Sequence, residues 1–192
     1  MKKLLYSLLV LTLLILGVYK IKKGGLNFSN ETGDAIDSLN HVVVYYNGDV
    51  SHVQGRTVVD GYNVGLKHQC VEFVKRYYLE HYNHKMPDSY GHAKSFYQTH
   101  LSDGKVNKQR NLTQYNNPSK TSPKIGDLIV FEGSTFNKYG HVAIISNVSE
   151  KTIEIIQQNP GPYAPSRENI KLNSKDGKFK IEGKRILGWL RK

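Results

Sequence analysis

The chain is poor in cysteine and in acidic residues, and both shortages limit what it can be. Cys70 is the single cysteine among 192 residues, which excludes an internal disulfide framework and a cysteine-rich zinc site. Acidic residues number 16 against 27 Lys and Arg, so the formal net charge is +11. Aromatic residues make up 10% of the chain, which argues against a disordered polycation. The length allows one ordinary domain with an appendage.

The amino terminus carries an apolar run from Leu4 to Val18, with lysines on both sides. A cleaved signal peptide should end in small residues, but the first alanine is Ala35, so we favour an uncleaved membrane anchor over residues 1–23. The run is short for a spanning helix, although flanking Tyr and Lys side chains can extend it. A cleaved signal and a buried helix are the alternatives. The lysines are nearly balanced across the run, so the orientation stays open.

Residues 24–40 are rich in Gly, Ser and Asn and are typical of a linker, which leaves residues 41–192 for the domain. Five of the basic residues bracket the apolar run, so the remaining 22 basic and 16 acidic residues give a balance of +6. That balance fits an anionic substrate or cell wall. Nucleic acid is not an expected partner, because the sequence contains no known reader motif.

Hydrophobic periodicity divides the domain into helices and strands. Apolar residues at helical spacing predict a helix over residues 70–82, and a second helix is expected near residues 89–101. Asn47-Gly48-Asp49 is typical of a turn, and residues 102–122 are polar and loop-like. Runs rich in β-branched and aromatic residues predict strands over residues 42–46, 125–131, 141–147, 152–158, 179–181 and 185–190. Helices that precede strands indicate an α+β fold with an antiparallel sheet.

Cys70 lies where the predicted helix begins. The positive end of a helix dipole and its unpaired N–H groups stabilise thiolate over thiol, which prepares a nucleophile. The alternative is that Cys70 is a small buried hydrophobic residue.

A nucleophilic thiolate needs a base, and the base needs an orienting partner. Among eight histidines, His141 opens a strongly apolar strand and follows Gly140. The next strand ends in Gln157-Gln158-Asn159, and consecutive antiparallel strands would bring Gln157 or Asn159 near His141. An amide oxygen can accept the imidazole N–H and fix its tautomer. A structural histidine and a polar strand terminus are the alternatives.

The order Cys, His, amide resembles the CHAP family, the cysteine- and histidine-dependent amidohydrolases/peptidases. The resemblance is strongest to the amidase domain of glutathionylspermidine synthetase/amidase. Gln69-Cys70-Val71-Glu72-Phe73 and Gly140-His141-Val142-Ala143 are its most specific motifs, and Leu187-Gly188-Trp189 favours the amidase branch. It implies a papain-like fold of N-terminal helices packed on an antiparallel sheet, here preceded by the expected membrane helix.

The resemblance implies that Cys70 is the nucleophile and His141 the general base. Gln157 falls where the amidase has a glutamate, and a neutral amide stabilises imidazolium less than a carboxylate does. Lys75 falls where the amidase has an arginine that engages a carboxylate of the glutathione part, so Lys75 is a candidate substrate-binding residue. Gln69 is either an oxyanion donor or a helix-cap contact, and Asn159 is expected to support the site.

The implied activity is hydrolysis of an amide without a cofactor or metal. Since no Gly-rich phosphate loop occurs, the ATP-dependent synthetase activity is not expected. His81 and His84 lack acidic or Cys partners at ligand spacing, so a metal site there is not expected. The alternatives are a peptidoglycan amidase or endopeptidase and an inactive binding domain. The predicted location is the bacterial cell membrane through a single-pass anchor, or secretion if the segment is cleaved.

Overall fold

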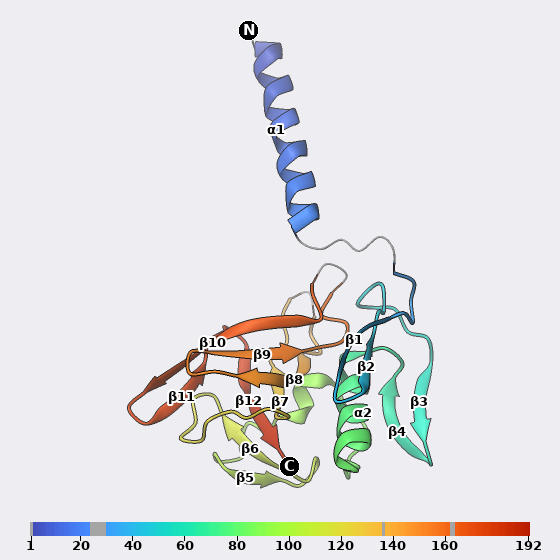
Figure 1. Ribbon diagram of the computed structural model, residues 1–192, viewed down its shortest axis with the longest axis vertical. Helices are drawn as coiled ribbons and strands as arrows, with labels where there is room; N and C mark the ends of the chain where they lie inside the picture. The colour runs from blue at the N-terminus through green and yellow to red at the C-terminus, as the bar shows by residue number, and fades with distance from the viewer. Residues whose placement is uncertain (1, 24–29, 136, 162–163) are drawn as a thin grey trace.

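The computed structural model describes residues 2–23, 30–135, 137–161 and 164–192. These residues contain two α-helices, one 3-10 helix and twelve strands, joined by turns and loops (Figure 1). In chain order they are α1 (Lys2–Lys23), β1 (Ala35–Leu39), β2 (Val42–Tyr45), β3 (Arg56–Val59), β4 (Tyr62–Leu66), α2 (Cys70–Tyr82), η1 (Ala93–Phe96), β5 (Lys105–Asn107), β6 (Leu112–Asn116), β7 (Leu128–Phe131), β8 (His141–Val148), β9 (Thr152–Ile156), β10 (Arg167–Lys175), β11 (Lys178–Ile181) and β12 (Ile186–Arg191).

Eight strands form one sheet in the order β11-β10-β9-β8-β7-β12-β6-β5, and every neighbouring pair is antiparallel. Two separate hairpins, β1-β2 and β3-β4, flank α2 (Figure 1). This arrangement agrees with the predicted α+β fold and antiparallel sheet.

Alternating apolar side chains of the central strands supply two cores, one on each face of the sheet. Phe73 and Tyr77 of α2 pack with Val142 and Ile144 of β8 in the first core, so the helix covers this face. Trp189 belongs to the second core, together with residues of β7 to β11. The large sheet is therefore buried on both faces near its centre, and α2 is fixed against β8.

The predicted helix over residues 70–82 is confirmed, and Asn83 ends it in the left-handed conformation with φ 48°. The second predicted helix, near residues 89–101, is wrong. Only a single 3-10 turn, η1, forms there, because Gly91 has a φ of +110° and Tyr97 is extended, and neither conformation continues an α-helix.

Four stretches without a predicted strand contain strands, namely those of β1, of β3 and β4, of β5 and β6, and of β10. Residues 24–29 of the predicted linker lie outside the described residues, but Ala35–Leu39 pairs with β2 through a two-residue turn at Asn40 and His41. Both turn residues have positive φ, the geometry that matches the twist of a hairpin. The polar stretch 102–122 contains β5 and β6, which complete one side of the sheet.

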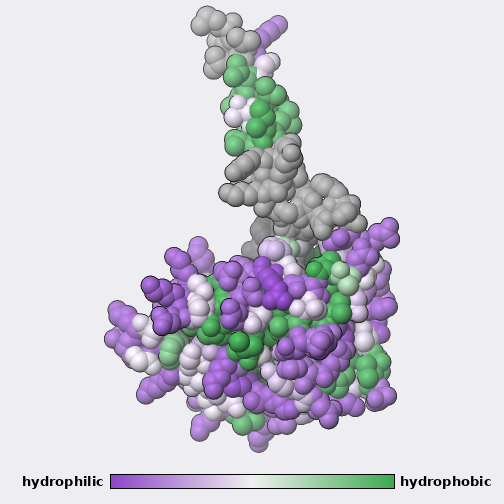
Figure 2. Space-filling model, viewed as in Figure 1, coloured by the Kyte–Doolittle hydropathy of each residue, from purple (hydrophilic) through white to green (hydrophobic). Residues whose placement is uncertain are grey.

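The described side chains of α1 are mostly hydrophobic, and those from Tyr6 to Leu16 are exposed (Figure 2). Within the part of the chain that the structure describes, no helix meets the length and hydropathy needed to cross a membrane. The predicted membrane helix is therefore not supported.

Gly188, in the centre of β12, gives the Leu-Gly-Trp motif a physical explanation. A Cβ on Gly188 would collide with the backbone oxygen of Tyr115 on β6. We expect Gly188→Ala to lower the free energy of unfolding by about 1–3 kcal/mol, because neither strand can move away without disturbing the ladder. Gly183→Ala is the matched control, since its Cβ would meet the flexible end of Ile186. Equal denaturant midpoints for the two variants would contradict this explanation.

Candidate active site

A cavity of about 620 Å3 lies where α2 begins and β8 begins. Cys70 and His141 both line it. Its walls come from the segment between β2 and β3, from the β3-β4 hairpin, from the start of α2, from the segments around the starts of η1 and β8, and from the segment after β9. The residues are Val50, Ser51, Val53, Arg56, Asn63, Gly65, Leu66, Gln69, Cys70, Val71, Ser89, Tyr90, Gly91, His92, Ala93, Asn137, Tyr139, Gly140, His141 and Asn159.

Cys70 is the first residue of α2, as predicted, and Gln69 is the N-cap. Gly65 lets β4 pass close to the helix start, because a Cβ there would lie 3.0 Å from the backbone of Glu72. Burial raises the pKa of the Cys70 thiol to about 11, although the backbone amides of Val142, Val71 and Cys70 itself act in the opposite direction. Desolvation thus outweighs the thiolate stabilisation that we expected from the helix terminus, and the thiol is protonated at neutral pH.

His141 is the first residue of β8. Gly140 before it is required, because a Cβ would lie 2.5 Å from the backbone oxygen of Phe131 and 2.9 Å from Cβ of Lys94. Burial lowers the pKa of His141 to about 4, the hydrogen bond to Gln157 raises it, and the charge of Arg185 lowers it further. The imidazole is therefore neutral at pH 7 and able to accept a proton.

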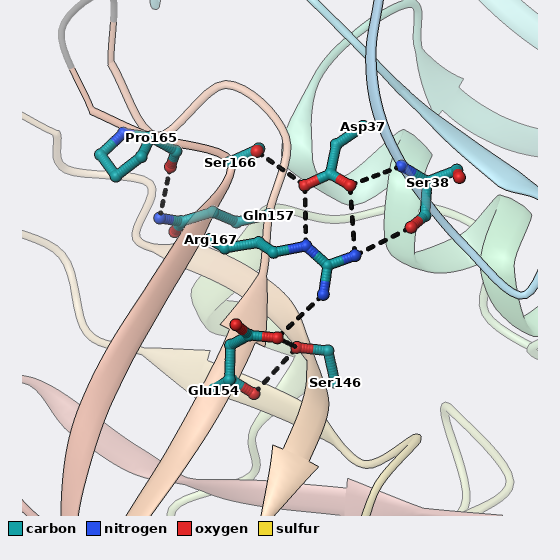
Figure 3. A network of polar contacts seen from close by, with 8 residues as sticks. All are labelled: Asp37, Ser38, Ser146, Glu154, Gln157, Pro165, Ser166 and Arg167. Carbon is teal, nitrogen blue, oxygen red and sulfur yellow. Dashed lines mark hydrogen bonds and ion pairs between the residues drawn. The ribbon is translucent and has the colours of Figure 1, made fainter. Parts of the chain in front are cut away.

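Gln157 follows the last residue of β9 and contacts His141, with 2.9 Å between Nε2 of the imidazole and Oε1 of the amide. The amide nitrogen of Gln157 donates to the backbone oxygen of Pro165 at 3.2 Å (Figure 3), which leaves Oε1 to face the histidine. Nε2 of His141 then carries the proton and donates it to Gln157. Nδ1 is the basic nitrogen of this tautomer.

The segment that holds Gln157 in place is fastened to β1. Arg167 donates to both carboxylate oxygens of Asp37, at 2.9 and 3.1 Å, and Ser166 donates to Asp37 at 2.7 Å (Figure 3). Arg167 also bridges to Glu154 of β9 at 2.8 Å. These bonds connect the start of β10, next to Pro165, with the hairpin and with β9.

Gln69 and Asn159 lie together on the cavity wall, where the amide nitrogen of Asn159 donates to Oε1 of Gln69 at 2.8 Å. The amide nitrogen of Gln69 donates to the backbone oxygens of His52 at 2.8 Å and Val50 at 3.2 Å. Asn159 donates to Val50 as well. The two side chains therefore hold the segment after β2 over the start of α2, and Gln69 makes no side-chain cap bond to its helix.

Lys75 lies behind the cavity wall. Its side chain is 1% exposed, and Nζ donates to the backbone oxygens of Asn63 and Ser89, which do line the cavity. Its amine thus donates to the protein backbone. These hydrogen bonds do not provide the substrate contact that the sequence predicts for Lys75.

A buried network at the start of α2 was missed in the sequence. Glu72 and Arg76 form a buried ion pair at 2.7 Å, one helical turn apart. Gln158 is fully buried and donates to Glu72 at 2.9 Å and to the backbone oxygen of Gln69 at 3.0 Å. Its Oε1 accepts the N–H of Tyr45 at 2.7 Å. Gln158 thereby connects the cysteine helix to the strand end that carries Gln157.

His81 and His84 do not share a site. His81 contacts the amide of Asn40 at 3.2 Å, whereas His84 contacts the backbone oxygen of Arg110 at 2.9 Å. Across the described residues, no group of three His, Cys, Asp or Glu side chains is placed to hold a metal ion.

The contact between His141 and Gln157 predicts how the pKa of His141 responds to substitution. A carboxylate in place of the amide favours imidazolium, so Gln157→Glu should raise that pKa by about one to three pH units. Gln157→Met removes the hydrogen bond that raises the pKa and should lower it. NMR titration of the imidazole resonance measures both. An unchanged pKa in Gln157→Glu would show that the two side chains are not in contact in solution.

Comparisons with known proteins indicate the family of the chain. Trypanothione synthetase of Crithidia fasciculata is 28% identical over 145 residues, which cover 73% of this chain and 22% of that protein. The bifunctional glutathionylspermidine synthetase/amidase of Escherichia coli (strain K12) is 31% identical over 106 residues, which cover 54% of this chain and 17% of that protein. The matched region is thus about a fifth of each relative's length.

Among solved structures, one titled "The crystal structure of Ly7917" aligns with 50% of this chain and 40% of its own, at a TM-score of 0.30 and 16% identity. The family model described as CHAP domain matches residues 59–159, which is more than half of the chain and includes Cys70, His141 and Gln157. The chain therefore belongs to the CHAP domain family.

Proposed function

We propose that the chain is a cysteine-dependent hydrolase of amide bonds, with Cys70 as the nucleophile and His141 as the general base. Family membership and similarity to a glutathionylspermidine synthetase/amidase support a hydrolase at the level of the family. The observation that supports Cys70 and His141 as nucleophile and base is the hydrogen bond between His141 and Gln157 at the cavity that Cys70 also lines. It supplies a base with a fixed tautomer to the cavity that the single thiol of the chain also lines.

The first half of the reaction forms a thioester. Because thiol and imidazole are both neutral at pH 7, Sγ of Cys70 attacks the amide carbonyl as its proton moves to Nδ1 of His141. The C–S bond forms, and the carbonyl oxygen becomes an oxyanion. Protonated His141 then gives its proton to the amine nitrogen, the C–N bond breaks and the amine leaves.

The second half releases the acid. His141 takes a proton from water, the hydroxide attacks the thioester carbonyl, and the C–S bond breaks as the proton returns to sulfur. Gln157 orients the imidazole throughout, and its uncharged amide gives the imidazolium less stabilisation than a carboxylate would.

Backbone N–H groups at the start of α2 are the proposed oxyanion donors. The first N–H groups of a helix have no partner within the helix and point toward its amino end. The side chain of Gln69 is a weaker candidate, because its amide nitrogen already donates to the backbone oxygens of Val50 and His52.

The substrate class that the comparisons favour is a small amide of the glutathionylspermidine type, since one relative is a glutathionylspermidine synthetase/amidase. Peptidoglycan is the second candidate. Tyr90 and Tyr139 line the cavity while 64% and 47% exposed, so their rings offer flat surfaces to a larger, ring-containing substrate.

The raised pKa of Cys70 predicts a thiol that ionises late. The ultraviolet absorbance of thiolate, taken as the difference between wild type and Cys70→Ala, should remain low through neutral pH and rise toward pH 11. The single cysteine makes this difference specific. Thiolate absorbance below pH 7 would instead indicate a preformed thiolate–imidazolium pair, and the proton transfer proposed above would be wrong.

The function is tested by incubating the 192-residue chain with glutathionylspermidine and, separately, with purified peptidoglycan. Cys70→Ala and His141→Ala should each lower the rate of product formation by at least about a thousandfold. His81→Ala is the matched control, because this histidine is exposed and outside the cavity lining. Equal rates of hydrolysis by wild type and Cys70→Ala would refute the cysteine-dependent mechanism. Absence of hydrolysis with both substrates would favour an inactive binding domain.

A further inference from the structure

One residue of the turn that leads into α2 has an unusual backbone conformation. The chain passes from β4 to α2 through this turn (Figure 1), and the N–H of Gln69 closes it by donating to the backbone oxygen of Leu66 at 3.1 Å. His68 is the third residue of the turn and has a φ of 62°. A positive φ at this position is usually supplied by Gly or Asn, because a larger side chain crowds its own backbone there. The backbone is therefore strained two residues before Cys70.

The side chain of His68 is packed between two segments of the first hairpin. It is 7% exposed, and its ring centre lies 5.2 Å from that of Tyr45 at the end of β2. On the other segment, just before β1, a Cβ on Gly33 would lie 3.5 Å from Cε1 of His68. A strained residue persists only where its surroundings determine its conformation. The open end of the β1-β2 hairpin thus fixes the turn through the ring of His68.

The ring of His68 acts through its shape and not through a charge or a hydrogen bond. Burial lowers the pKa of His68 and the charge of Glu72 raises it, with a net decrease, so the imidazole is uncharged at pH 7. Within the described part of the chain, its Nδ1 is buried without a hydrogen-bond partner. A buried polar atom without a partner costs free energy, so the contacts of the ring are those of packing.

The turn determines the orientation of the peptide group that joins Gln69 to Cys70. The carbonyl oxygen of Gln69 accepts from the N–H of Phe73 at 3.1 Å and from Nε2 of Gln158 at 3.0 Å. In a planar trans peptide the N–H points opposite to the carbonyl, so the N–H of Cys70 is directed toward the amino end of the helix. This N–H is one of the proposed oxyanion donors. A change of conformation at His68 would rotate the peptide group and displace both the N–H and Sγ of Cys70.

We propose that His68 is a positioning residue, whose ring, packed against Tyr45 and Gly33, holds the turn that places Sγ and the N–H of Cys70 in the cavity. Its effect on hydrolysis rests on the proposed function, whereas its effect on the position of the thiol does not. His68 is not among the described residues that line the cavity, so it acts on a substrate through Cys70. Displacement of a reacting group by about 1 Å can lower a rate about a hundredfold.

Three variants of the 192-residue chain test this role. His68→Gly accepts the positive φ without strain and removes the ring, so it should lower kcat for glutathionylspermidine about tenfold to a hundredfold at nearly unchanged KM. His68→Phe retains a flat ring and should keep kcat within about threefold of wild type. His84→Gly is the matched control, because His84 is a buried histidine, 8% exposed, outside the described cavity lining. It should lower stability without lowering kcat.

The pKa of the Cys70 thiol reports its position without requiring hydrolysis. Burial raises this pKa to about 11 in wild type, so a thiol that is no longer held in its buried place ionises at lower pH. Thiolate absorbance is measured as the difference between each chain and the same chain with Cys70→Ala. It should rise at lower pH in His68→Gly than in wild type, and it should be unchanged in His68→Phe and His84→Gly.

An unchanged pKa of Cys70 in His68→Gly, or an unchanged kcat of that variant where wild type is active, would overturn the positioning role. So would a His68→Phe variant that behaves as His68→Gly does, or an equal loss of kcat in His84→Gly. Circular dichroism checks folding, and His68→Asn, which tolerates a positive φ and lacks the ring, replaces His68→Gly if that variant does not fold. A lowered pKa in a chain that hydrolyses neither glutathionylspermidine nor peptidoglycan would support the role of His68 and reject the proposed function, so the two failures are distinguishable.

Discussion

The buried ion pair of Glu72 and Arg76, completed by Gln158, is the interaction on which the geometry of the site depends. Arg76 donates to the backbone of β2, while Gln158 accepts from that strand and donates to the first turn of α2. One network therefore joins the helix start, the first hairpin and the end of β9. A buried pair of charges contributes little net stability, but its partners cannot be separated without exposing an uncompensated charge, so it fixes the position of α2 against the sheet.

That position of α2 brings the end of a helix and the ends of two strands together. Cys70 opens a helix, His141 opens a strand and Gln157 follows a strand. In the antiparallel ladder Ile144 is opposite Ile156, so the residue after β9 lies within diagonal reach of the first residue of β8. The ends of elements have unpaired backbone groups and side chains free to enter a cavity, which is why the reactive groups collect there and not in the middle of the sheet.

Sequence reasoning could predict the parts that depend on local pattern. It predicted the helix over residues 70–82 and the adjacency of the strands that carry His141 and Gln157, because apolar periodicity and short turns determine both. It missed β5 and β6, since buried amides there satisfy one another, as Asn107 and Gln114 do at 3.1 Å. It also missed the role of Gln158: in a run of amides, one residue of register decides which side chain is buried, and only tertiary contacts determine the register. The desolvation of Cys70 is equally invisible in the sequence.

The distribution of charge around the cavity follows from the same division between local pattern and burial. The sequence shows an excess of basic residues but not which of them are buried. Lys75 and Arg110 are buried and donate to backbone oxygens of residues that line the cavity. Cys70 and His141 are uncharged at neutral pH. A neutral pair needs no counter-ion when the site is empty, which explains why an amide can occupy the position of Gln157. Among the described lining residues, Arg56 is the one Lys, Arg, Asp or Glu side chain. The fixed charge of the lining thus comes from β3, whereas the uncharged cysteine and histidine come from the starts of α2 and β8.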